Sequence, residues 1–251
     1  LVINCGSSSL KYQLIDMTDE SVLAIGLVER IGIEGSVLKH EIPGRDKQII
    51  EEPMTDHKDA LKHVLDALVN PEYGAIKSMD EINAVGHRVV HAGEKFASSV
   101  VITDEVVKAL EDCIELAPLH NPPNLIGINA CREILPTVPM VAVFDTAFHQ
   151  TMPESSYLYG IPYEYYKEFG VRRYGFHGTS HKYVSYRAAE ILGKDIKDLK
   201  AMLRYVGENR AEFSAEYGNM SAQSLGAIQR SLITLEDEGG AEFFGEPAID
   251  I

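Results

Sequence analysis

Apolar and polar residues alternate in four short runs at the amino end of the chain. Residues 1–3 and 10–15 predict two strands joined by a tight turn at residues 6–9. The alternation resumes at residues 21–28 and 36–42, which predicts two more strands. The first part of the chain is therefore expected to form an antiparallel meander.

A helical spacing of apolar residues follows the meander. The segment TDHKDALKHVLDALVN predicts a helix, with Thr55 as its N-cap and Asn70-Pro71 as its stop. Its apolar stripe, at positions i, i+3, i+4 and i+7, consists of Leu61, Val64, Leu65 and Leu68.

The pattern then changes to strands interleaved with helices. A strand is predicted at residues 82–90, and a helix opened by Thr103 follows it, with an apolar stripe of Val106, Val107, Leu110 and Ile114. The segment NPPN, residues 121–124, is interpreted as a break in regular structure before another helix. The continuous apolar run VPMVAVF, residues 138–144, predicts a strand buried on both faces.

The helix predicted in SHKYVSYRAAEIL is expected to turn Val184, Ala188 and Ile191 inward and to end at Gly193. Alternating strands and helices indicate an α/β sheet, whose ligands lie beyond the carboxyl ends of the strands. Asp145 follows the strand at residues 138–144 and so occupies such an end. Beyond about residue 200 the periodicity weakens.

Charge and cysteine content narrow the classes of function. The 251 residues carry a formal charge of −15, which argues against nonspecific nucleic-acid binding. An anionic substrate would therefore need a local basic pocket. Three separated cysteines favour a reduced, cytoplasmic protein, and no apolar run approaches the roughly 20 residues that span a membrane.

Residues suited to chemistry gather in five segments. The turn GSSS, with Lys11 just beyond it, could bind an anion through its backbone N–H groups and hydroxyls, although Gly and Ser are also ordinary turn residues. It is not a Walker motif. The segments GHRVVHAGEKF, LAPLHNPPN, VFDTAFHQTMP and RRYGFHGTSHKY supply Arg88, His120, Asp145 and His177.

Each of these residues has a structural alternative. Arg88 could pair with a surface carboxylate, or its guanidinium could capture carboxylate or phosphoryl oxygens. Asp145 could cap a helix, or it could hold the water ligand of a metal or orient a nucleophile. His177 could be a core histidine, a zinc ligand together with His181, or a hydrogen-bond donor to substrate.

A Ser-rich turn with one Lys, one Arg, one Asp and one His provides the groups that phosphoryl transfer requires. That reaction depends on positioning and on neutralising charge more than on a strong base.

Five segments resemble acetate kinases in sequence, order and spacing: VINCGSSSLKYQLID, GHRVVHAGEKF, LAPLHNPPNLIGI, VAVFDTAFHQTMP and VRRYGFHGTSHKYV. The resemblance covers residues 1 to about 200. It implies an actin-like ATPase fold built from two ribonuclease-H-like domains, and usually a homodimer. It also implies reversible, Mg²⁺-dependent transfer of the ATP γ-phosphoryl group to acetate, giving acetyl phosphate and ADP.

The resemblance also implies roles for individual residues. Asn4 would help to place the metal, while Ser7, Ser9 and Lys11 would form the first phosphate loop. Arg88 would bind acetate and the transferring phosphoryl group. Asp145 would be the essential acidic residue, which assists the metal or the carboxylate nucleophile. His177 would donate a hydrogen bond to the transition state. His120 would support them, and the pocket for the acetate methyl group would consist of Val90, Leu119 and Phe176.

The resemblance changes after about residue 200. Members of the family carry a His-Leu-Gly-Asn-Gly loop and a second arginine there, and this sequence has neither. Instead YVGENRAEF, residues 205–213, resembles a later adenosine-site motif of the family. This resemblance implies that Gly207, Glu208 and Asn209 bind the nucleotide.

The expected domains are therefore a complete first domain at residues 1–148 and a partial second domain at residues 149–251. A chain of only this length is expected to have little or no kinase activity. The alternatives are a propionate kinase and a noncatalytic protein that binds nucleotide or carboxylate.

Overall fold

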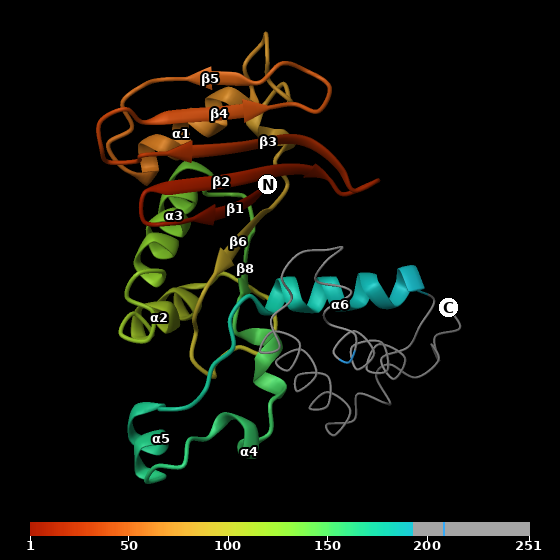
Figure 1. Ribbon diagram of the computed structural model, residues 1–251. Helices are drawn as coiled ribbons and strands as arrows, with labels where there is room; N and C mark the ends of the chain where they lie inside the picture. Colours follow the sequence, from red (N-terminus) through yellow and green to blue (C-terminus); the bar gives the residue numbers. More distant parts are fainter. Residues whose placement is uncertain (193–207, 209–251) are drawn as a thin grey trace. The chain divides into compact units, whose positions relative to one another are not determined.

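The computed structural model describes residues 1–192 and residue 208, and it divides the chain into two units, Leu1–Ala147 and Phe148–Ile251. The first unit contains one eight-stranded sheet in the order β5-β4-β3-β2-β1-β6-β8-β7 (Figure 1). Its strands are β1 (Val2–Cys5), β2 (Ser9–Asp16), β3 (Ser21–Glu29), β4 (Val37–Glu41), β5 (Gln48–Ile50), β6 (Val85–Val89), β7 (Val100–Val101) and β8 (Met140–Phe144).

Strand direction changes in the middle of this sheet. The first five strands form an antiparallel meander, while β6 and β8 run parallel to β1. The short strand β7 closes the other edge in antiparallel pairing with β8. The carboxyl ends of β1, β6 and β8 therefore lie together at one edge of the sheet.

Helices of both units complete the described structure. The first unit has α1 (His57–Leu68), the 3₁₀ helix η1 (Met79–Glu81), α2 (Asp104–Asp112) and α3 (Asn121–Ile134). The helix η2 (Ala147–Thr151) leads into the second unit, which has α4 (Glu154–Tyr157), α5 (Glu164–Phe169) and α6 (Gly178–Leu192). Among the helices of residues 1–192, none combines the length and apolar content needed to cross a bilayer.

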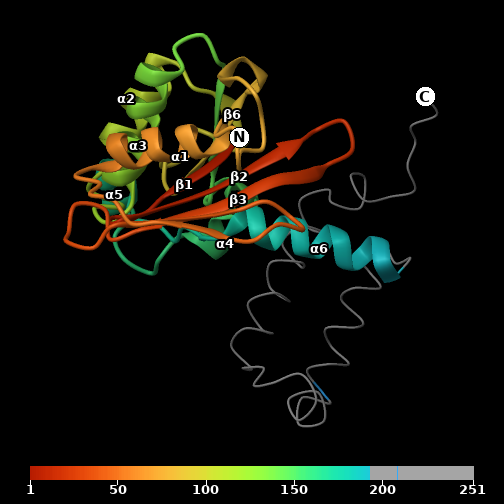
Figure 2. The ribbon, with the colours of Figure 1, turned by 90° about the horizontal axis from the view of Figure 1, so that it is seen from above.

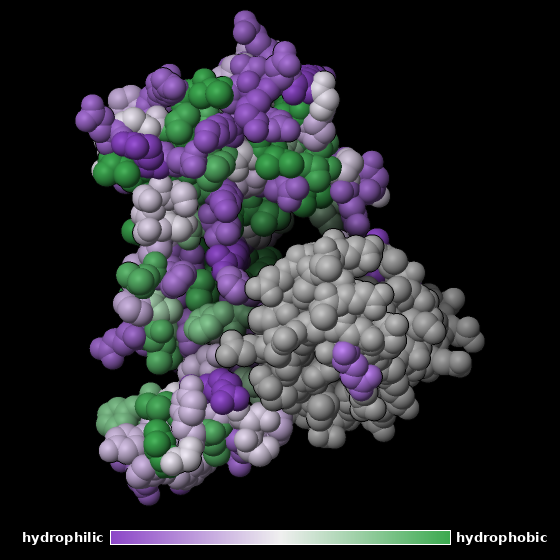
Figure 3. Space-filling view, in the orientation of Figure 1, coloured by the Kyte–Doolittle hydropathy of each residue, from purple (hydrophilic) through white to green (hydrophobic). Residues whose placement is uncertain are grey.

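The helices α1, α2 and α3 cover one face of the sheet (Figures 1 and 2). Alternate residues of β1, β2, β6 and β8 are buried on that face, because successive side chains of a strand point to opposite faces. The buried side chains form two apolar clusters, and all of their members lie within residues 1–147. The opposite face of the meander, seen at the top of Figure 3, mixes hydrophilic and hydrophobic residues.

Most predicted elements of the first unit are confirmed. The meander forms as expected, the stripe of α1 is buried, and Thr103 caps α2. The prediction of Thr55 as the cap of α1 is wrong by one residue. Asp56 is the cap, because its carboxylate accepts from the backbone N–H of Asp59 at 2.8 Å, while the Thr55 hydroxyl donates to the Asp59 side chain.

Other expectations differ from the structure or are not tested by it. Residues 121–124 form the first turn of α3, since prolines fit the first helical positions, where no N–H partner is needed. Strand β8 buries alternate residues only, and β5 was not predicted. Val184 is exposed, so its predicted inward position in α6 is wrong. Gly193 lies outside the described residues, and no strand follows β8 within the residues that are described.

Candidate functional site

Three polar side chains from separate segments meet at the carboxyl ends of the central strands. Arg88 lies in β6, between β1, which carries Asn4, and β8, which Asp145 directly follows. Arg88 Nε donates to Asp145 Oδ1 at 3.0 Å, and Nη2 donates to Oδ2 at 2.5 Å. Arg88 Nη1 donates to Asn4 Oδ1 at 3.3 Å. The sheet therefore aligns one guanidinium group with two oxygen-bearing side chains.

The ion pair between Arg88 and Asp145 has one open side. The Asp145 side chain is 4% exposed, whereas the Arg88 side chain is 34% exposed. A two-point contact of this kind fixes the plane of the guanidinium group as well as its position. A small anion that approaches from solvent would meet a guanidinium group that is already oriented.

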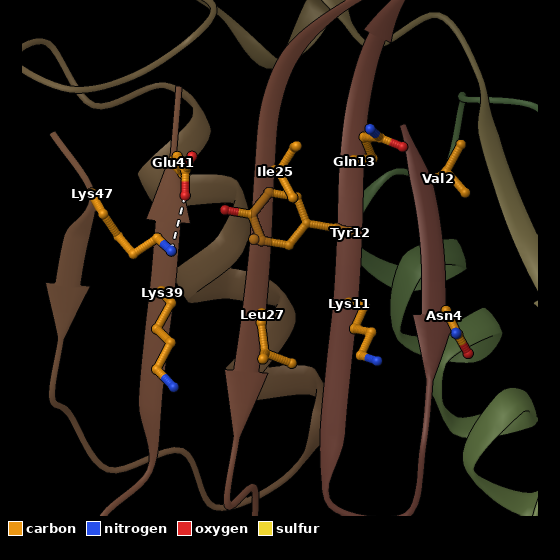
Figure 4. Close-up of a pocket in the computed structure, with 11 residues that line it drawn as sticks. Val2, Asn4, Lys11, Tyr12, Gln13, Ile25, Leu27, Lys39, Glu41 and Lys47 are labelled. Carbon is orange, nitrogen blue, oxygen red and sulfur yellow. Dashed lines mark ion pairs between the residues drawn. The ribbon is translucent and has the colours of Figure 1, made fainter. Parts of the chain in front are cut away.

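Lys11 extends this polar group onto the neighbouring strand. It pairs with Asn4 in the register of β1 and β2, and its side chain is exposed on the open face. Both residues line a hollow of about 400 Å³, and Figure 4 shows their side chains on adjacent strands. Glu41 and Lys47 form an ion pair at the far side of the hollow (Figure 4).

The serine turn connects β1 to β2 next to these residues. The Gly6 N–H donates to the Ser9 carbonyl at 2.8 Å, which closes the turn, and Ser7 and Ser8 are exposed. Ser9 is half-buried and begins β2. The turn is held from the helical side by His57, the first residue of α1, whose Nε2 donates to the Gly6 carbonyl at 2.7 Å.

Two buried asparagines in the first turn of α3 brace the same edge of the sheet. Asn124 accepts from the Val90 N–H at 3.1 Å and donates to the Cys5 carbonyl at 2.9 Å, so it links the ends of β6 and β1. Asn121 accepts from the N–H of His91 and donates to the carbonyls of His91 and Leu110. Sequence reasoning missed both roles, and it missed His57.

The other residues assigned from the first unit have different exposures. Val90 is buried, Leu119 is 76% exposed, and His120 is exposed at the N-cap of α3. The neighbouring His91 is buried, and burial lowers its pKa to about 4, since the charged imidazolium is poorly solvated there. His91 is therefore neutral near pH 7.

The second unit contributes Phe176 and His177. His177 adopts a left-handed backbone conformation with φ of 56°, which is uncommon for a residue with a side chain. The bend is braced by His149, whose Nε2 is 3.1 Å from the Phe176 carbonyl. A Cβ on Gly175 would lie 2.2 Å from the His149 ring, so this position requires glycine. Phe176 is partly exposed.

Of the three residues expected to bind adenosine, the structure describes one. Gly207 and Asn209 lie outside the described residues, and Glu208 is exposed.

The oxygens of the first unit suit magnesium better than zinc. Magnesium is commonly held by one or two carboxylates together with substrate phosphates and water, which Asp145 and the Asn4 amide oxygen fit. Structural and catalytic zinc sites use three or four protein ligands. Within residues 1–192 and at residue 208, no three His, Cys, Asp or Glu side chains are grouped to hold a metal.

Comparisons with known proteins agree with this architecture. The model of the acetokinase family matches residues 1–227. Acetate kinase of Clostridioides difficile is 68% identical over 227 residues, covering 90% of this chain and 57% of the relative. Acetate kinase of Clostridium acetobutylicum is 62% identical over 226 residues, covering 90% and 56%.

Solved structures give the same result. The Porphyromonas gingivalis acetate kinase superimposes with a TM-score of 0.74 at 56% identity, covering 78% of this chain and 49% of that one. A propionate kinase from Francisella tularensis gives 0.72 at 43% identity, covering 77% and 49%. The fold is thus the actin-like α/β fold of the acetate and propionate kinases.

The chain belongs to the acetokinase family. It spans slightly more than half the length of the curated relatives that it matches.

Proposed function

We propose that the protein containing this chain is an acetate kinase. It transfers the γ-phosphoryl group of ATP to acetate, giving acetyl phosphate and ADP, and it also catalyses the reverse reaction. The observation that carries the proposal is the two-point contact of Arg88 with Asp145, with Asn4 as the third member, beside the exposed serine turn. The identity to acetate kinases over 90% of the chain supports it.

The proposed reaction is a direct in-line transfer. A carboxylate oxygen of acetate forms a bond to the γ-phosphorus as the bond from that phosphorus to the bridging oxygen of ADP breaks. The serine turn, through Ser7 and Ser9, and Lys11 hold phosphate oxygens, because N–H, hydroxyl and ammonium groups are suitable donors. Arg88 neutralises charge on acetate and on the transferring group, while Asp145 keeps the guanidinium oriented.

Asn4 and Asp145 are the residues proposed to hold Mg²⁺. When bound, the ion would neutralise phosphate charge. Asp145 lies at the end of a buried strand, and its N–H donates to the Val89 carbonyl at 2.9 Å. This hydrogen bond fixes the backbone that carries the carboxylate.

Further roles follow from the family resemblance. His177 donates a hydrogen bond to the transition state, and His120 supports it. Val90, Leu119 and Phe176 line the site of the acetate methyl group, and Gly207, Glu208 and Asn209 contact the nucleotide. We also propose that the protein is a cytoplasmic homodimer.

The test is acetyl phosphate formation from ATP, Mg²⁺ and acetate by the protein expressed from its complete reading frame. Substitution Arg88→Ala should lower kcat by about 10² to 10³, since it removes charge stabilisation in the transition state. His177→Ala should also lower kcat. An unchanged rate in either variant would remove that residue from the mechanism, and no acetyl phosphate from the unaltered protein would refute the proposal.

Propionate is the second candidate acceptor, because one structural neighbour at 43% identity is a propionate kinase. One methylene group in an apolar pocket changes binding by only about 1 to 3 kcal/mol, so kcat/KM should be compared for both acids. Binding of ATP without turnover on either acid would instead favour a noncatalytic nucleotide-binding protein.

A further inference from the structure

His57 lies far from the serine turn in sequence but touches it in the fold. It is the first residue of α1 and is only 6% exposed, and its ring reaches back 51 residues to the Gly6 carbonyl at 2.7 Å. A carbonyl oxygen can only accept, so Nε2 carries the hydrogen and donates. This contact connects the start of a core helix to the backbone of the turn.

The contact determines the orientation of the next N–H group. The peptide between Gly6 and Ser7 is trans, so its C=O and its N–H point in opposite directions. With the Gly6 carbonyl held against His57 on the helical side, the Ser7 N–H points away from the ring. Ser7 and Ser8 are exposed, so that N–H is directed towards the side that a ligand can reach.

Neighbouring peptides of the turn are held separately. Asn124 donates to the Cys5 carbonyl at 2.9 Å, and the Ile31 N–H donates to the Ser8 carbonyl at 3.0 Å. The Gly6 N–H is used within the turn, by the Ser9 carbonyl. His57 therefore restrains the peptide between Gly6 and Ser7, which none of these other contacts holds.

We propose that His57 is a positioning residue for the phosphate loop. It holds the peptide between Gly6 and Ser7 so that the Ser7 N–H is preorganised to bind a phosphate oxygen of the nucleotide. This inference rests on the proposed function, because it takes the turn to be the nucleotide phosphate site. Preorganised donors are effective because they need no reorientation when charge arrives.

The test compares His57→Ala with His57→Gln in the complete protein. His57→Ala should raise KM for ATP about tenfold or more and leave KM for acetate unchanged, since one oriented hydrogen bond to a charged group is lost. His57→Gln should restore most of the affinity, because its amide N–H can donate to the same carbonyl. It also keeps the test possible if His57→Ala does not fold.

His40→Ala is the matched control. His40 is also a buried histidine with Nε2 facing a backbone carbonyl, that of Tyr73 at 3.2 Å, but it lies in β4 and away from the turn. This variant should have a lower Tm and an unchanged KM for ATP. The proposal is overturned if His57→Ala lowers Tm alone, or if His57→Gln binds ATP as weakly as His57→Ala.

Calorimetric titration with ATP and Mg²⁺ separates this proposal from the proposed function. If the unaltered protein binds ATP but forms no acetyl phosphate, the proposed activity is wrong. The role of His57 is then tested by the ATP affinity of its variants alone. If acetyl phosphate forms normally and both His57 variants bind ATP like the unaltered protein, the positioning role fails and the activity stands.

Discussion

Arg88 connects the stability of the sheet edge to the chemistry proposed there. Its two-point contact leaves Asp145 almost fully buried with a charged partner. Removing one member of such a pair is more costly than removing both, because a buried charge then loses its oppositely charged partner. The same side chain should therefore matter for folding as well as for turnover.

Substitution Arg88→Ala should lower the free energy of unfolding by about 2 to 3 kcal/mol. This is less than for a fully buried pair, because the Arg88 side chain is 34% exposed. The double variant with Asp145→Asn should lose less than Arg88→Ala alone. Urea unfolding of both variants and of Asp145→Asn measures this. Additive losses would mean that the pair is not coupled.

His87 places a histidine inside the apolar core, on the helical face of β6. It is 3% exposed, and among the described residues its Nε2 has no hydrogen-bond partner. Burial lowers the pKa of His87 from 6.5 to about 4. Above pH 6.5 the ring is neutral in both the folded and the unfolded chain, so it adds no pH dependence there.

As the pH falls from about 6.5 to 4, the unfolded chain binds a proton at His87 that the folded chain does not, and up to about 3 kcal/mol of stability is lost. His87→Leu should remove this loss. Its stability relative to the unaltered protein should therefore increase between pH 7 and pH 5 in urea unfolding. Parallel curves for the two proteins would contradict the lowered pKa.

At the level of elements, α3 fits against β1 through a glycine. A Cβ on Gly127 would lie 2.4 Å from Cys5 Sγ, which is far inside contact distance. The helix thus gives up the helical propensity of alanine, worth about 1 kcal/mol, in order to approach the strand that leads into the serine turn.

Gly127→Ala should therefore destabilise the protein by about 1 to 3 kcal/mol despite the better helix former. Adding Cys5→Ala should recover part of the loss, because the side chain in conflict is gone. Thermal unfolding of the two single variants and the double variant measures the coupling energy between positions 127 and 5. A Gly127→Ala variant more stable than the unaltered protein would show that α3 shifts freely.

The first-unit elements could largely be predicted from sequence, because local pattern determines them. The stripe of Leu61, Val64, Leu65 and Leu68 specified α1, and Thr103 specified the start of α2. The role of Asn121 and Asn124 could not be predicted, since their partners lie 11 to 119 residues away. Two prolines between the asparagines looked like a break, although a first helical turn accepts them.

The main residues of the site could be predicted from sequence, but the contacts that hold them in place could not. Motif resemblance selected Arg88, Asp145 and Asn4, and the structure brings these three together in the first unit. The motif resemblance did not point to His57. The only sequence signal for it is a histidine directly after the acidic residue that caps a helix. Val184 was misjudged because a helical period alone does not identify which side of α6 is covered.

At the level of the whole molecule, the buried apolar clusters found among the described residues all lie within residues 1–147. The described part of the second unit leaves many large apolar residues exposed, including Ile161, Phe169 and Tyr183. The first unit therefore contains the interactions that a domain needs to fold alone, and its length is typical of one.

A chain ending at Ala147 should accordingly unfold in one cooperative transition. Circular dichroism and tyrosine fluorescence in urea should give coincident curves. Gradual or non-coincident loss of the two signals would mean that the sheet depends on residues beyond Ala147.

The three cysteines, at positions 5, 113 and 131, are all buried thiols. Burial raises the pKa of each, that of Cys5 to about 12, so almost none is in the reactive thiolate form near neutral pH. These three thiols should therefore react very slowly with maleimide dyes. A single cysteine introduced at the exposed Ser8 could carry a fluorophore beside the turn, with little background labelling elsewhere in the first unit.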